Sequence, residues 1–171
     1  RLVVTKAGFQ MGSAKAIDGD LADWNDETFV TSNTAEGITA KYSAFLGNDG
    51  VYIALEIKEA SIDIGRTNTA GDWWKNTNLE FFATDNAYAG RIMTFGGKLY
   101  HTGYITDAEM KFVDGETEDV WTVEIFIANE QLKNETAETT SVKVDFGGQL
   151  YGAVTADFQG YARDIVVNRK A

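Results

Sequence analysis

Residues 38–57 read ITAKYSAFLGNDGVYIALEI, and this stretch decides the fold. Apolar residues recur at every second position on both sides of residues 47–50, which is the period of a strand that buries one face. The alternating apolar residues are Ile38, Ala40, Tyr42, Ala44 and Leu46, then Val51, Ile53, Leu55 and Ile57. Glycine, asparagine and aspartate between the two runs favour a tight turn. The stretch therefore predicts a β-hairpin with strands 38–46 and 51–57.

Similar strand patterns recur along the rest of the chain. They predict further strands at residues 79–83, 91–95, 98–105, 109–113, 120–127, 142–146, 150–156 and 162–167. Glycine-containing turns at residues 96–97 and 114–116 pair four of these strands into two more hairpins. Short strands between turn signals are typical of sandwiches and barrels. We therefore predict an all-β fold, a two-sheet antiparallel sandwich of about ten strands.

The chain has 171 residues, of which 44% are hydrophobic, and this length suits one sizeable core. We therefore expect a single domain that spans residues 1–171. The sequence begins at Arg1 without an initiator methionine or an apolar leader, so we interpret it as a domain excised from a longer chain.

Charge and composition argue against several functions. The net charge of −11 disfavours nucleic acid and anionic membrane surfaces as partners, and no apolar run is long enough for a membrane helix. The chain has no cysteine and one histidine, His101, which leaves few of the residues that nucleophilic catalysis and zinc binding need. A pair of carboxylates for glycoside hydrolysis stays open, because 26 aspartates and glutamates are scattered along the chain. We predict that the domain is not an enzyme, and that these carboxylates form a solvated surface.

Two adjacent tryptophans, Trp73 and Trp74, stand in a polar segment directly before the strand at residues 79–83. Neighbouring residues of an extended chain point to opposite sides. One indole would then lie in the core while the other exposes a face on which a sugar ring can stack. The alternative is that both tryptophans close the end of the sandwich.

Four segments, in this order, resemble segments of the family 9 carbohydrate-binding modules and of their relatives with a jelly-roll or DOMON-like sandwich. They are residues 16–24 (AIDGDLADW), 49–58 (DGVYIALEIK), 74–82 (WKNTNLEFF) and 121–127 (WTVEIFI), with Leu132 after the last. The first segment is similar to the opening strand and turn of the family. The resemblance implies a noncatalytic module that binds a poly- or oligosaccharide.

Carried over residue by residue, the family's sugar clamp falls on Trp74, with Trp73 beside it, and has Glu80 and Arg91 as polar partners. The resemblance implies that Glu80 accepts hydrogen bonds from sugar hydroxyls and that Arg91 donates to them. The late tryptophan that closes the family's clamp has no match in this chain. Tyr161 is the nearest aromatic candidate for that wall, and Gln159 is a polar candidate close to it.

Other residues carry weaker hypotheses. We interpret Trp24 and Trp121 as core residues, because both lie in strand-like patterns. Asp18 and Asp20 are candidate ligands of a structural Ca²⁺ ion, which prefers oxygen donors and which the resemblance allows. Acidic turns on a charged surface explain the same residues equally simply.

Three functions remain open. The first is a carbohydrate-binding module of an extracellular or cell-surface bacterial protein, which targets an attached catalytic or surface domain to polysaccharide. The second is a structural or protein-interaction sandwich without a sugar site. The third is a haem domain, because some DOMON-like relatives hold haem through methionine and histidine, and Met93 and His101 stand on neighbouring predicted strands.

Overall fold

The computed structural model describes residues 14–35, 38–59, 78–82, 90–95, 98–113, 115–128, 130, 139–147 and 163–168. These residues form one short 3-10 helix and ten strands. The helix is η1 (Leu21–Trp24), and the strands are β1 (Val30–Ala35), β2 (Ile38–Leu46), β3 (Gly50–Glu59), β4 (Asn78–Phe82), β5 (Gly90–Phe95), β6 (Lys98–Gly103), β7 (Asp107–Val113), β8 (Asp119–Ala128), β9 (Thr139–Gly147) and β10 (Arg163–Asn168).

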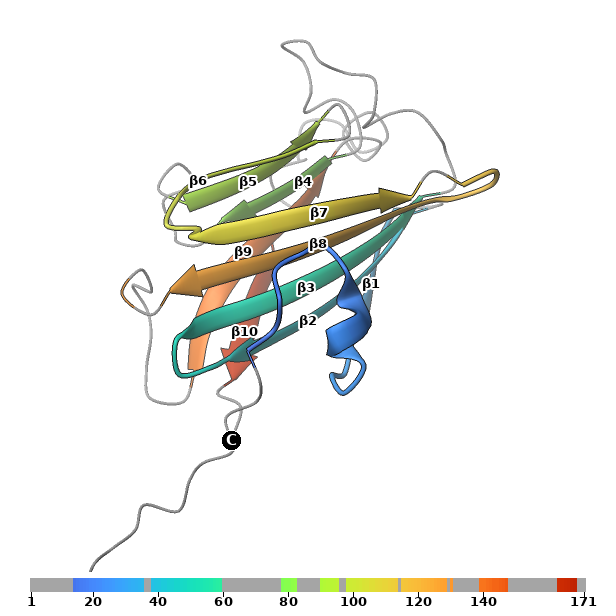
Figure 1. The fold of residues 1–171 in the computed structure, drawn as a ribbon. Helices are drawn as coiled ribbons and strands as arrows, with labels where there is room; N and C mark the ends of the chain where they lie inside the picture. Colours follow the sequence, from blue (N-terminus) through green and yellow to red (C-terminus); the bar gives the residue numbers. More distant parts are fainter. Residues whose placement is uncertain are drawn as a thin grey trace, which may run out of the picture.

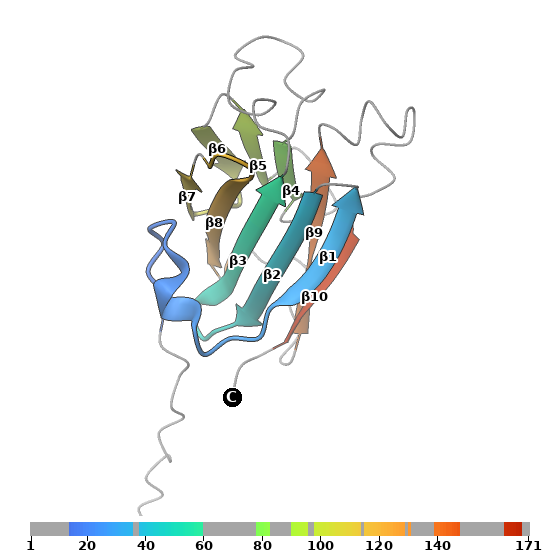
Figure 2. The same ribbon diagram turned by 90° about the vertical axis from the view of Figure 1, so that its right-hand side faces the viewer.

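The strands form two five-stranded sheets that stack face to face (Figures 1 and 2). The first sheet has the order β1-β2-β3-β8-β7, and the second has the order β10-β9-β4-β5-β6. All described neighbours within each sheet are antiparallel. The predicted antiparallel β-sandwich is therefore confirmed.

The hairpin predicted from residues 38–57 is confirmed in its register. Tyr42 pairs with Leu55 and Leu46 with Val51, and the turn closes with a hydrogen bond from the Gly47 N–H to the Gly50 carbonyl at 2.8 Å. Six other predicted strands correspond to β4, β5, β6, β7, β8 and β9. The last predicted strand corresponds to β10, while the one at residues 150–156 lies outside the described residues.

The structure differs from the sequence analysis at two places near the start of the chain. Strand β1 was not predicted, because residues 30–35 read VTSNTA and lack an apolar alternation. Residues 16–24 were expected to hold a strand, but they contain no strand and end in the helix η1. Asp20 caps η1, because its side chain accepts a hydrogen bond from the Ala22 N–H.

The core between the sheets is built from alternate residues of the first sheet and closed by residues such as Ile92 of β5. Its buried members are Ala40, Leu46, Val51, Ile53, Leu55, Ile57, Ile92, Ile105, Ala108, Trp121, Val123, Ile125 and Ile127. The predicted core position of Trp121 is confirmed, since it is 1% exposed.

A second apolar cluster covers the outer face of the first sheet. The N-terminal strap, residues 14–29, crosses this face in front of β8, β3 and β2 (Figure 1). Trp24 of the strap is 1% exposed and packs on Phe45 of β2 with ring centroids 5.6 Å apart, and Phe45 in turn stacks on Tyr52 of β3 at 5.0 Å. The centre of β2 and β3 is therefore buried on both faces, whereas the alternation predicted burial on one.

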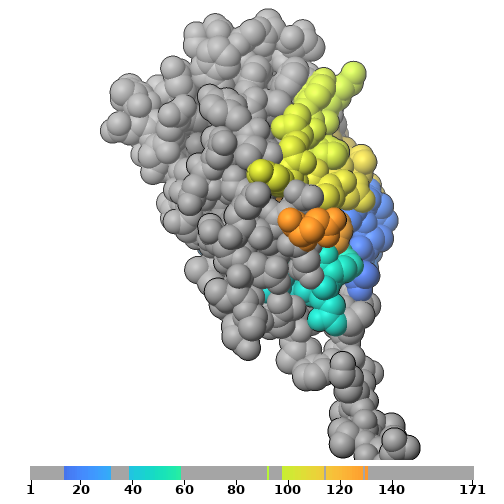
Figure 3. Space-filling model, turned by 90° about the vertical axis from the view of Figure 1, so that its left-hand side faces the viewer, coloured from blue at the N-terminus to red at the C-terminus, as the bar shows by residue number. Residues whose placement is uncertain are grey.

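Strands β6 and β7 lie side by side and join the two sheets at one edge (Figure 1). Figure 3 shows this edge in space-filling form, with β6 and β7 above the end of β8, the β2–β3 turn and the strap. Tyr100 of β6 is an aromatic residue at this edge whose side chain is exposed, with an exposed fraction of 39%.

Candidate functional site

Glu80 and Arg91 fall on the same face of the second sheet. The register pairs Glu80 of β4 with Met93 of β5, and Phe82 with Arg91. Directly paired residues share a face, so Glu80 and Arg91 occupy diagonal positions, which in antiparallel pairs lie about 7–8 Å apart. Ile92, between Arg91 and Met93, is buried in the core between the sheets. The face that carries Glu80 and Arg91 is therefore the outer one.

Tyr100 adds an aromatic residue to this outer face that the sequence reasoning missed. It pairs with Met93, while Leu99 beside it packs on the core. The alternation of Leu99 with Tyr100 was the available signal, but an exposed tyrosine in a strand is common and did not single this residue out. Glu80, Arg91 and Tyr100 thus hold positions on one surface across β4, β5 and β6.

The remaining proposed sugar ligands lie outside the described residues. These are Trp73, Trp74, Gln159 and Tyr161. In the sequence, Trp74 precedes Asn78 by four residues, and Asn78 begins β4, the strand that carries Glu80. Its part in a sugar site stays a prediction.

The proposed haem ligands do not lie on one face. His101 pairs with Ile92, whereas Met93 pairs with Tyr100, so the register puts Met93 and His101 on opposite faces of the β5–β6 hairpin. Two axial ligands of one haem must approach the same iron. This pair does not fit haem.

The carboxylate of Glu124 on β8 is 0% exposed and accepts three hydrogen bonds. One oxygen, Oε1, accepts a hydrogen bond from Trp24 Nε1 at 2.7 Å. The other, Oε2, accepts from the backbone N–H groups of Asp18 and Gly19 at 2.9 and 2.7 Å. Glu124 therefore fixes the strap to the sheet and satisfies the buried indole of Trp24.

Two further contacts join the strap to the first sheet, and Lys15 links residues within the strap. Lys111 of β7 forms an ion pair with Asp20 at 3.2 Å, and the Thr122 hydroxyl donates to the Gly19 carbonyl. The buried ammonium of Lys15 contacts carboxylates of Asp26 at 2.8 Å and Glu27 at 3.3 Å, and donates to the Asp23 carbonyl. Burial opposes the charge on Lys15, but its hydrogen bonds to the two carboxylates prevail and raise its pKa.

Asp18 and Asp20 already have partners that compete with calcium. The Asp18 carboxylate accepts from the Asp20 N–H at 2.8 Å. The two oxygens of Asp20 accept from the Ala22 N–H at 3.1 Å and contact the Lys111 ammonium at 3.2 Å. The described residues contain no group of three or more histidine, cysteine, aspartate or glutamate side chains placed to hold a metal ion. This pair as placed does not fit the six to eight oxygen ligands of Ca²⁺.

The two influences on the Glu124 carboxyl oppose each other. Burial is the larger influence and raises its pKa above the ordinary value of 4.5, whereas the hydrogen bonds from Trp24, Asp18 and Gly19 lower it. The net direction is upward. The folded protein therefore binds a proton at Glu124 at a pH where the unfolded chain has already lost it.

The raised pKa of Glu124 predicts how the difference in stability between wild type and Glu124→Gln changes with pH. As pH falls from neutrality toward 4.5, wild type should gain stability relative to Glu124→Gln, because folding then takes up a proton at Glu124. Urea unfolding of both proteins across this interval measures the difference. If wild type instead loses stability relative to Glu124→Gln as pH falls, the hydrogen bonds from the three donors outweigh burial and lower the pKa of Glu124.

Gly19 needs the conformational freedom of glycine. Its φ is +79°, and a Cβ built there would lie 2.8 Å from the backbone nitrogen of Lys111. Gly19→Ala should therefore lower the free energy of unfolding by about 2–3 kcal/mol. Gly47→Ala is the matched control, since the nearest atom to a Cβ there is a side-chain oxygen of Asp49 at 3.2 Å, and it should cost less. If urea unfolding shows equal losses of stability in the two variants, Gly19 does not need the conformational freedom of glycine.

The described part of the chain contains no helix with the length and hydrophobicity that crossing a membrane requires.

Comparison with known proteins finds solved structures with a similar fold. No protein-family model matches the chain, and no curated protein matches it. Among solved structures, a family 9 carbohydrate-binding module from Caldicellulosiruptor kristjanssonii in complex with glucose matches with a TM-score of 0.53 and 15% identity over 93% of each chain. A module of this family from the same organism, in complex with cellotriose, matches with a TM-score of 0.47 and 13% identity over 91% of this chain and 80% of the other. The first match shows that the sandwich has a fold like that of a family 9 module.

Proposed function

We propose that this sandwich is a noncatalytic carbohydrate-binding module that stacks a sugar ring on Trp74, with Glu80 and Arg91 as hydrogen-bonding partners. The observation that carries the proposal is the common outer face of Glu80 and Arg91, in a sandwich whose fold is like that of family 9 modules. The diagonal separation of the two positions suits contact with one ring from two sides.

The residue types suit a neutral sugar. An indole face packs against the axial C–H groups of a pyranose, while its hydroxyls need donors and acceptors at the rim. Arg91 supplies paired donors, and Glu80 accepts. Tyr100 adds an exposed aromatic surface on the same face.

In a longer parent protein, such a module brings the attached domains to polysaccharide. We infer that the module acts outside the cell or on its surface, where polysaccharides are found, and that it is joined to a catalytic or surface domain. Binding then raises the local concentration of that domain at the polysaccharide by avidity, without chemistry in the module itself.

Calorimetric titration of the purified chain with D-glucose and with cellotriose tests this proposal. We expect saturable binding of at least one of them, because the matched module was solved with glucose. The titrations are run in calcium and in chelator, so that a metal requirement would appear as a loss of affinity in chelator.

Arg91→Lys sharpens the test. Lysine keeps the charge but loses the planar pair of donors, so affinity should fall about tenfold. An unchanged affinity would remove Arg91 from the site. Thermal melting of the variant shows whether the fold survives.

A further inference from the structure

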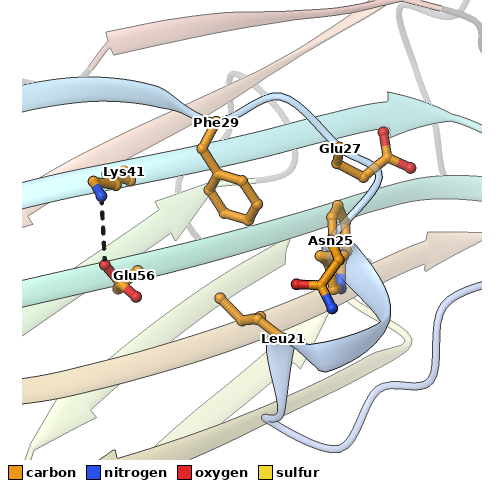
Figure 4. Close-up of a pocket in the computed structure, with 7 residues that line it drawn as sticks. Leu21, Asn25, Glu27, Phe29, Lys41 and Glu56 are labelled. Atoms are coloured by element: carbon orange, nitrogen blue, oxygen red, sulfur yellow. Dashed lines mark ion pairs between the residues drawn. The ribbon is translucent and has the colours of Figure 1, made fainter.

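A pocket of about 320 Å³ lies between the strap and the outer face of the first sheet (Figure 4). Its lining residues come from η1, the strap and strands β2 and β3. They are Leu21, Trp24, Asn25, Glu27, Phe29, Lys41 and Glu56. Because Glu80 and Arg91 hold positions on the outer face of the second sheet, this pocket is on the opposite side of the sandwich.

One wall of the pocket is apolar and held in place. The ring of Phe29 meets Trp24 edge to face, with centroids 6.4 Å apart and an interplanar angle of 66°. Trp24 is itself fixed by its hydrogen bond to Glu124. Figure 4 shows Phe29 above β2 and β3, with Leu21 on the other side of the opening. A ring held in this way offers a preformed surface on which the C–H face of a ligand can pack.

The strand side of the pocket carries two charges with spare hydrogen-bonding capacity. Lys41 Nζ and Glu56 Oε1 are 4.0 Å apart, and Lys58 Nζ is 3.6 Å from the same oxygen. Charge-assisted hydrogen bonds are about 2.7–2.9 Å long, so neither ammonium is bonded tightly to Glu56. A hydroxyl between Lys41 and Glu56 accepts from the first and donates to the second.

The opposite end of the pocket supplies an acceptor. The Asn25 amide nitrogen donates to the Ala22 carbonyl at 2.6 Å, which leaves the amide oxygen to accept a hydrogen bond from a ligand. Glu27 also lines this end, and it shares the Lys15 ammonium, 3.3 Å away, with Asp26 at 2.8 Å. Lys15, Lys41 and Lys58 together balance the charges of Asp26, Glu27 and Glu56 around the pocket, which favours a neutral ligand.

We propose that this pocket is a second ligand site, which binds one neutral pyranose ring independently of Trp74. The ring would pack on Phe29 and place hydroxyls between Lys41 and Glu56 and at Asn25. Ligand pockets span about 300–1,000 Å³, so a volume of 320 Å³ suits a single ring rather than a chain.

Nuclear magnetic resonance of the ¹⁵N-labelled chain, titrated with D-glucose, tests the proposal. Backbone amides of Asn25, Phe29, Lys41 and Glu56 should shift together and saturate in the millimolar range. The same shifts should persist in Trp74→Ala, because the proposed contacts to the ring come from Phe29, Lys41, Glu56 and Asn25. Gluconate, with its negative charge and open chain, should bind at least about tenfold more weakly than glucose.

Three variants assign the contacts. Lys41→Met and Glu56→Gln should each weaken the pocket shifts about tenfold, because each removes one partner of the bridging hydroxyl. Lys58→Met is the matched control, since Lys58 contacts Glu56 but does not line the pocket, and it should bind as wild type does.

The outcomes separate this inference from the proposed function. Absent pocket shifts, or pocket shifts that vanish in Trp74→Ala, would overturn the second site while leaving the module proposal standing. Pocket shifts unchanged in both Lys41→Met and Glu56→Gln would overturn it as well. Pocket shifts without any effect at Arg91 or Tyr100 would support the second site and count against the sugar site of the second sheet.

Discussion

Replacing Glu124 with alanine should lower the free energy of unfolding by about 3–5 kcal/mol, a large share of the stability of a domain of this size. The carboxylate accepts three hydrogen bonds from buried or half-buried donors: Trp24 Nε1 and the N–H groups of Asp18 and Gly19. Alanine leaves these donors without an acceptor and opens a cavity beneath the strap. Urea unfolding measures the loss.

The matched control is Glu109→Ala. Glu109 pairs directly with Glu124 across β7 and β8, but its side chain is exposed. Its removal should change the free energy of unfolding by no more than about 0.5 kcal/mol. Similar losses in the two variants would contradict the role assigned to Glu124.

A second pair of variants tests the same network from its indole side. Trp24→Phe removes the donor to Glu124, whereas Trp121→Phe removes an indole N–H for which the described residues offer no hydrogen-bond acceptor. Trp24→Phe should therefore be the more destabilising, although both rings are 1% exposed.

Replacing Trp74 with alanine should weaken saccharide binding at the proposed clamp about thirtyfold or more, which corresponds to about 2 kcal/mol. The stacked ring supplies most of the apolar contact to a sugar, and alanine offers no face in its place. Calorimetric titration with the tightest-binding oligosaccharide measures the change.

Trp74→Phe is the control for this second prediction. Phenylalanine keeps an aromatic face, so its affinity should lie between those of wild type and Trp74→Ala. Thermal melting of both variants separates lost stacking from lost folding. Full affinity in a folded Trp74→Ala protein would remove Trp74 from the site.

The sandwich was predictable where apolar residues alternate. Residues 38–57 indicated β2, β3 and their turn, because each inward residue there is apolar. Strand β1 gave no such signal, since an edge strand of polar residues needs no buried face of its own. The other edge strands, β6, β7 and β10, were predicted, so β1 was missed because of its polar sequence rather than because of its place at an edge.

Burial by the strap was harder to foresee. The unbroken apolar run Val51–Tyr52–Ile53–Ala54–Leu55 was a sign that β3 is buried on both faces. What covers its outer face could not be read from that run, because the strap begins far earlier in the sequence. The resemblance of residues 16–24 identified this segment but suggested a strand where the structure has η1.

The candidate site was predictable only in part. The resemblance supplied Glu80 and Arg91, and the register places both positions on one outer face. Glu124 was missed, because a glutamate in a strand alternation gives no indication of a partner 100 residues away in the sequence. The pocket at Phe29 was missed for the same reason, since its walls come from the strap and from two strands that meet only in the folded chain.

The most direct test of the carbohydrate-binding assignment is a glycan array probed with the purified wild-type chain, whose folding is first confirmed by thermal melting. We predict retention on at least one class of plant, fungal or bacterial saccharide. A folded protein that binds none of these glycans would contradict the assignment and favour a structural or protein-interaction sandwich.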